Sequence, residues 1–290
     1  MKPILSPKEL GAVIGVSEST VKRWVDDGTV TAAKTAGGHR RIAIWDAIRF
    51  IRESKAPIIR PDILGLADIE AVRREIPTGR SETERFFQYL RTGQAAEARG
   101  LLLAMYLSGE SVEAIVDGPI QEAMSRIGEL WKHSASGIFY EHRATDLCAQ
   151  AIHQLRQMFT TPADAPVALG GSPAGDPYAI ASSCASTVLA SIGFHALNLG
   201  ANSPSAALIA AIEENRPRLV WLSVSATENA IDVAAEVRAL LPHLQDAVLV
   251  LGGRRLPTLA IPASPAVKSG SSMTELAGIA RGVLSGVAHR

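Results

Sequence analysis

The stretch LVWLSVS, residues 219–225, begins with four apolar positions, which is typical of a strand buried on both faces of a parallel sheet. Three similar runs flank it: VALGG at 167–171, FHALNLG at 194–200 and AVLVLGG at 247–253. Segments with helical spacing lie between these runs, at 179–192, 205–214 and 230–241. This alternation predicts a doubly wound, Rossmann-like parallel sheet over residues 164–288.

Ligands of such sheets bind beyond the carboxyl ends of the strands. Asp176 and Tyr178 follow the first run, Ser223 lies in the central run, and Gly252 and Gly253 end AVLVLGG. We therefore expect these five residues to border a binding site, with the glycines leaving room for a buried ligand.

Residues 80–160 have apolar side chains at three- and four-residue intervals, which predicts a four- or five-helix bundle. Within it, Trp131 is followed after nine residues by Glu141 and His142. On one unbroken helix Trp131 and His142 would lie about 16 Å apart. The segment SASG, residues 134–137, allows the chain to fold back, so that the indole, carboxylate and imidazole converge above a flat ligand.

The N-terminal part predicts a winged helix-turn-helix over residues 1–75. Ser6 and Glu9 form a capping box for a first short helix, and Ser17 begins a second helix that Gly28 stops. The following TVTAAKTAGGHRRI, residues 29–42, is expected to form a hairpin or wing. Residues 56–77 contain prolines and suggest a flexible linker with one short helix.

The net charge of zero hides an asymmetry. Residues 1–60 hold 11 Lys or Arg and 6 Asp or Glu, which leaves 18 basic and 23 acidic residues in the remainder of the chain. The first fifth is therefore basic and suited to phosphate, whereas the rest is not.

The wing motif TAGGHRR, Thr35 to Arg41, resembles the TPGGHRR-like signature of MerR-family transcriptional regulators, with Ala36 replacing proline. The resemblance implies promoter binding, with the second helix in the major groove and the wing arginines on phosphate. The candidate DNA-binding residues are Ser17, Thr20, Lys22, Arg23, Gly37, Gly38, His39, Arg40 and Arg41.

The pattern W-x9-EH closely resembles the helical cap of CarH/LitR-type cobalamin photoreceptor regulators, where it covers the upper face of adenosylcobalamin. That family also has D-x-H-x-x-G after the first strand, and its histidine binds cobalt from below. Here Asp176 remains, but Tyr178 replaces the histidine and Ala181 the glycine. A neutral phenol is a poor cobalt ligand, so we expect ordinary base-off cobalamin binding to be altered or lost.

Three interpretations of the sensor remain open. Cobalamin binds with its own base attached or with His142 as the one protein ligand to cobalt; another tetrapyrrole, such as haem with its iron on His142, occupies the cleft; or a protein partner acts instead. A light-sensing regulator and a corrinoid-binding methyltransferase-like protein are the alternatives to the regulator with an altered sensor. No catalytic pair can be assigned, so we expect a non-enzyme.

We further expect the chain to assemble with itself, as a dimer or higher oligomer. No apolar run approaches the roughly 20 residues needed to cross a bilayer, and the N-terminus lacks the apolar stretch of a signal peptide. The sequence therefore predicts a cytoplasmic protein without a membrane partner.

Overall fold

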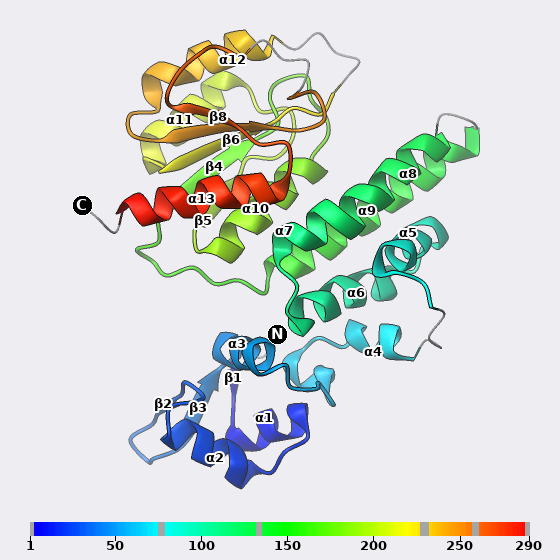
Figure 1. Ribbon diagram of the computed structural model, residues 1–290, viewed down its shortest axis with the longest axis vertical. Coiled ribbons are helices and arrows are strands. Elements are labelled where there is room, and N and C mark those ends of the chain that lie inside the picture. The colour runs from blue at the N-terminus through cyan, green and yellow to red at the C-terminus, as the bar shows by residue number, and fades with distance from the viewer. Residues whose placement is uncertain (1–2, 75–78, 132–134, 227–231, 257–260, 288–290) are drawn as a thin grey trace. The chain divides into compact units, whose positions relative to one another are not determined.

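The computed structural model describes residues 3–74, 79–131, 135–226, 232–256 and 261–287. They form two compact units (Figure 1). The first contains Met1–Ser111 and Gly118–Met158, and the second contains Val112–Asp117 and Phe159–Arg290. Among the described residues, no helix has the length and apolar character needed to cross a membrane.

The first unit begins with a small antiparallel sheet and three helices. Its elements are β1 (Ile4–Leu5), α1 (Pro7–Ile14), α2 (Glu18–Asp26), β2 (Ala33–Lys34), β3 (Arg40–Ala43) and α3 (Ile44–Ser54). The capping box of Ser6 and Glu9 is present at the start of α1, and Ser17 caps α2, as the sequence predicts. Strand β1 was not predicted. It pairs with β3 and places Leu5 opposite Ile42, both fully buried.

The expected flexible linker is a packed part of this unit over its described residues. It contains η1 (Pro61–Leu64) and α4 (Asp68–Arg73), and buries Leu64, Leu66 and Ile69. Arg99, in helix α6 (Ala95–Ser108), binds both carboxylate oxygens of Asp68, at 2.7 and 3.2 Å. The prediction of flexibility is therefore wrong here, because apolar contacts and this ion pair hold the segment to the bundle.

Helices α5, α6, α8 and α9 pack against one another in the first unit. Their bounds are α5 (Glu82–Thr92), α6 (Ala95–Ser108), α8 (Gln121–Trp131) and α9 (Ala135–Arg156). Fully buried side chains, among them Phe86, Leu90, Leu102 and Leu155, fill the space between them. Helices α8 and α9 contact each other, as the predicted fold-back requires, but α9 already begins at Ala135, so most of the predicted SASG break is helical.

The second unit is built on the predicted parallel sheet. Its strands are β4 (Val167–Gly171), β5 (His195–Asn198), β6 (Leu219–Ser223), β7 (Val248–Gly252) and β8 (Val267–Ser269), in the spatial order β5-β4-β6-β7-β8. The four apolar runs are all strands, which confirms the prediction, whereas β8 was not predicted. The order reverses between β4 and β6, so the carboxyl ends of these two strands form the switch point of the sheet.

Helices cover both faces of this sheet (Figure 1). They are α10 (Ile180–Ile192), α11 (Ser205–Asn215), α12 (Val233–Leu240) with η3 (Leu241–His243), and α13 (Met273–Val287). Val220 and Leu222 of β6 face the core with α11 and α12, whereas Leu219 and Trp221 face the core with α10 and α13. Burial on both faces explains why β6 lacks polar alternation.

A short segment between α6 and α8 belongs to the second unit. It consists of α7 (Val112–Ile115) and the start of a short π-helix, η2 (Val116–Ile120). The Asp117 carboxylate accepts the backbone N–H groups of Met273 and Thr274 at 2.7 and 2.9 Å, and thereby caps α13. Glu113 binds Arg281 at 2.5 Å. Two carboxylates thus anchor α7 to α13, although about 160 residues separate them.

The contact between α4 and α6 generates a stability prediction. A Cβ atom on Gly100 would lie 2.1 Å from the backbone oxygen of Asp68, closer than any real contact. We expect Gly100→Ala to lower the free energy of unfolding by about 1–3 kcal/mol, because α4 must move away from α6. Gly128→Ala in α8, where nothing lies within 4 Å, is the control and should gain up to about 1 kcal/mol. Denaturant titration of both variants checks this, and equal effects would contradict it.

The two cysteines generate a second prediction, because each reports on one unit. Burial raises the pKa of the Cys148 thiol to about 12, and Cys184 of α10 is buried as well. We therefore expect neither to react with a disulfide reagent at pH 8 until its unit opens. The free energy of unfolding should also fall as the pH rises above about 8.5, because the Cys148 thiol then ionises in the unfolded chain but stays protonated in the folded one. Labelling of the native chain as fast as in denaturant would contradict this.

Candidate functional site

The turn of the hairpin is open to solvent. The N–H of Gly38 donates to the oxygen of Thr35 at 2.8 Å, and the N–H of Thr35 donates to the oxygen of His39 at 3.0 Å. Gly38 has a φ of +75°, a left-handed conformation that glycine adopts without strain. Gly37, Gly38 and His39 are all exposed. The predicted wing tip is therefore free to meet a partner.

An ion pair that the sequence did not predict holds this hairpin to α2. Arg40 binds both carboxylate oxygens of Asp26, at 2.7 and 2.9 Å, and Lys34 lies 3.4 Å from the same carboxylate. The Arg40 hydrogen bond keeps the pKa of Asp26 below its ordinary value, so the pair is charged at neutral pH. Arg40 thus has an internal partner, and its contact with phosphate stays a prediction. Arg41 is exposed and has no ion pair within the described residues.

The predicted DNA-facing residues of α2 lie around its first two turns. The Ser17 hydroxyl accepts the Thr20 N–H at 3.2 Å and lies 2.8 Å from the Thr20 hydroxyl, so both side chains serve the cap. Lys22 is paired with Glu18 at 2.8 Å. Arg23 is exposed, and the described part of the chain offers it no ion pair. Among the predicted contacts, Arg23 and Arg41 are therefore the cations open to an external anion.

The residues predicted to cap a cofactor lie at the facing ends of α8 and α9. Trp131 is the last residue of α8, and its side chain lies outside the described set. The His142 side chain is 76% exposed, and its Nε2 lies 3.5 Å from Oε2 of Glu141. Thr145 donates to the Glu141 carboxylate at 3.0 Å. Glu141 and His142 are thus adjacent on α9, with the imidazole open to solvent.

Large apolar side chains are exposed beside this pair. Ile138, Phe139 and Tyr140 are 49%, 58% and 39% exposed. The Arg143 guanidinium lies over the Phe139 and Tyr140 rings, 4.9 and 5.3 Å from their centroids. We call residues 138–142 the aromatic start of α9. Exposed apolar clusters of this kind often mark binding surfaces.

Asp176 and Tyr178, which we expected below the ligand, lie in the loop after β4. Asp176 is fully buried, and its carboxylate accepts three backbone N–H groups: that of Tyr178 at 3.0 Å, that of Ser225 at 2.6 Å and that of Ala226 at 3.0 Å. Tyr178 is 50% exposed. The sequence suggested that Asp176 was available to orient a histidine at position 178. The structure shows instead that the carboxylate holds backbone N–H groups of two loops, which the sequence did not predict.

The glycines of AVLVLGG also serve the fold itself. A Cβ on Gly253 would lie 2.4 Å from the backbone oxygen of Val224, so the close approach of the loop after β6 requires glycine at this position. Ser223 is 5% exposed and pairs with Gly252 in the sheet. Their role in ligand binding stays a prediction.

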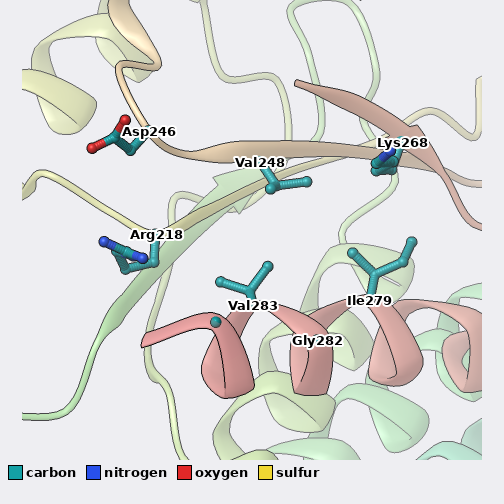
Figure 2. A pocket seen from close by; sticks show the side chains of 8 residues that line it. Arg218, Asp246, Val248, Lys268, Ile279, Gly282 and Val283 are labelled. Atoms are coloured by element: carbon teal, nitrogen blue, oxygen red, sulfur yellow. The ribbon is translucent and has the colours of Figure 1, made fainter. Parts of the chain in front are cut away.

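A groove of about 460 Å³ lies at the opposite, amino edge of the sheet (Figure 2). Val248, Ile279 and Val283 form its apolar lining. Arg218, Asp246 and Lys268 also border it. None of the predicted site residues lines it. Nor do the described residues contain a group of three His, Cys, Asp or Glu that could hold a metal ion.

Comparisons with known proteins give one family match and several similar structures. Residues 82–156, which span α5 to α9, match the family model of the B12 binding domain. The monomethylamine corrinoid protein of Methanosarcina barkeri has a similar structure, with a TM-score of 0.50, 14% identity, and coverage of 68% of this chain and 96% of that one.

Two further solved structures are more distant. A cobalamin-binding protein of Desulfitobacterium hafniense has a TM-score of 0.33 at 14% identity over 69% of this chain and 98% of its own. The methanol:cobalamin methyltransferase complex of Methanosarcina barkeri has a TM-score of 0.33 at 13% identity, and the match covers 76% of this chain and 84% of that one. No curated protein sequence matches the chain. Residues 82–156 thus resemble the B12 binding domain, and the likeness to the monomethylamine corrinoid protein is a likeness of fold.

Proposed function

We propose that the chain is a DNA-binding transcriptional regulator of the MerR type, and that its cobalamin-binding type of module is the sensor. The observation that carries the proposal is the Arg40–Asp26 pair, which fixes an exposed hairpin against the end of α2. A short helix and a wing fixed side by side are what a winged helix-turn-helix needs to read one groove and hold the adjacent backbone.

The charge of this part supports the same proposal. Residues 1–60 have five more basic than acidic residues. Exposed Arg23 and Arg41 are suited to bidentate contacts with phosphate, and Lys22 becomes available when it leaves Glu18. Ser17 and Thr20 stand at the start of α2, where side chains of a recognition helix approach base edges.

The N-terminal elements and the bundle are linked within one unit. The Arg52 guanidinium of α3 stacks over the Tyr106 ring of α6 at 3.7 Å, and donates to the backbone oxygen of Glu110 at 3.2 Å. Arg99 joins Asp68 of α4 to Gln150 of α9. We infer that a change in the bundle alters the placement of the wing. Self-assembly would then change DNA affinity strongly, because linked sites bind at a high effective concentration.

A second candidate is a protein whose main task is to bind a corrinoid or another tetrapyrrole, with or without light sensing. The match of residues 82–156 to the B12 binding domain favours it. The aromatic start of α9 offers an apolar surface with an exposed imidazole, which suits a planar cofactor with a metal centre. This candidate does not account for the fixed hairpin, so we rank it second. In both cases we propose a binding protein and not an enzyme.

The regulator proposal predicts a specific salt effect. Arg41→Ala should weaken binding to every duplex and reduce the slope of log K against log salt by about 1, because one phosphate contact is lost. Arg91→Ala removes the same charge from an exposed site on α5 and should leave both unchanged. Fluorescence anisotropy at two or more salt concentrations measures this. Equal behaviour of the two variants would contradict the wing assignment.

The cofactor candidate predicts a spectroscopic difference between two histidines of α9. If His142 binds the metal of a tetrapyrrole, His142→Ala should change the visible spectrum of the chain mixed with haem or hydroxocobalamin. His153→Ala, an exposed histidine on the same helix, should not. Indistinguishable spectra for wild type and both variants would exclude His142 as a ligand to these two metals.

A further inference from the structure

The loops after β4 and β6 meet at the switch point of the sheet. In open parallel sheets the crevice between two such loops is where ligands enter. Here the Asp176 carboxylate joins them, because it accepts the N–H of Tyr178 from one loop and the N–H groups of Ser225 and Ala226 from the other. A carboxylate with three N–H donors and no exposed surface is a strong, charge-assisted tie.

Further hydrogen bonds hold the loop after β4, both within the loop and to Asn202. The Ser172 hydroxyl donates to the backbone oxygen of Tyr178 at 2.8 Å. Asn202 accepts the N–H of Gly175 at 2.7 Å through its side chain, and its own N–H donates to the backbone oxygen of Asp176 at 2.8 Å. The loop is therefore bonded on both sides of Asp176. It cannot release the carboxylate by moving one residue.

A second tie joins the same end of the sheet on the α10 side. The indole N–H of buried Trp221 in β6 donates to the Ser182 hydroxyl at 3.0 Å, and that hydroxyl donates to the Asn198 side-chain oxygen of β5 at 2.7 Å. Asn198 also accepts the N–H of Gly200 at 3.0 Å. The carboxyl end of β5 and the middle of β6 are thus linked through one serine of α10.

We propose that Asp176 is a structural clasp that closes the switch point, and that the loop it holds supplies no metal ligand. The change at position 178 is then one part of a rebuilt loop and not the loss of a single side chain. A histidine at position 178 would need an acceptor for its ring N–H, and it would have to share a carboxylate that already accepts three backbone N–H groups.

The proposal predicts the behaviour of the wild-type chain first. The amides of Ser225 and Ala226 should exchange with deuterium slowly, because a buried carboxylate accepts both. Asp176→Asn should speed their exchange by about tenfold or more, since an amide offers one acceptor oxygen and turns N–H donors toward other donors. Reaction of Cys184, in the same unit, should accelerate, whereas Cys148 in the other unit should keep its rate.

The matched control is Asp232→Asn, because Asp232 accepts one backbone N–H at the exposed start of α12 and asparagine caps nearly as well. Exchange at Ser225 and Ala226 should be unchanged in it. Fast exchange at these amides in the wild-type chain would overturn the proposal, even if Asp176→Asn fails to fold. So would a folded Asp176→Asn with wild-type exchange.

The metal-ligand part is tested separately with Tyr178→His. Mixed with hydroxocobalamin, this variant should give the same visible spectrum as wild type and as Tyr178→Phe, with no histidine bound to cobalt in place of the cofactor's base. A histidine-ligated spectrum that appears in Tyr178→His alone would overturn the proposal. No arm of the experiment uses DNA, so its outcome is independent of the regulator function.

Discussion

Strand β6 is buried along its whole length, and most of the second unit follows from this constraint. A strand without a solvent face requires a helix layer on each side, which α10 and α13 provide on one side and α11 and α12 on the other. Its carboxyl end must also be covered, because backbone N–H groups that emerge from a buried strand need partners. The Asp176 carboxylate is the hydrogen-bond acceptor for the N–H groups of Ser225 and Ala226. The need to pair these two amides therefore brings the loops after β4 and β6 together at the switch point.

The sequence was sufficient wherever the information was local. Apolar runs of five to seven residues predicted β4, β5, β6 and β7, and side-chain oxygens at helix starts predicted the caps of α1 and α2. It was insufficient for β1 and β8, which have two and three residues and obtain their stability from a neighbouring strand. The segment after α3 looked like a linker for the same reason. Its prolines are visible in the sequence, whereas the contacts of Ile69 and Asp68 with α6 depend on residues far along the chain.

In the candidate sites, the sequence indicated which residues are present but not which other residues they contact. The exposed basic wing and the open imidazole of His142 agree with what their residue types predict. The partners of Arg40 and Asp176 could not be read from the sequence, because Asp26 lies 14 residues from one and Ala226 lies 50 residues from the other. A family motif indicates which residue stands at a position, but the fold decides whether a carboxylate there serves a ligand or the backbone.

The capping of α13 by Asp117 makes the second unit discontinuous in the chain. The peptide segment 112–117 supplies the acceptor for two N–H groups at the start of α13, yet both of its neighbours in sequence belong to the first unit. A fragment that begins at residue 159 would leave these amides and Arg281 without their carboxylates. The α/β part therefore cannot be transferred to another protein as residues 159–290 alone. The transfer must include the short helix α7 with Asp117, or a segment that replaces it.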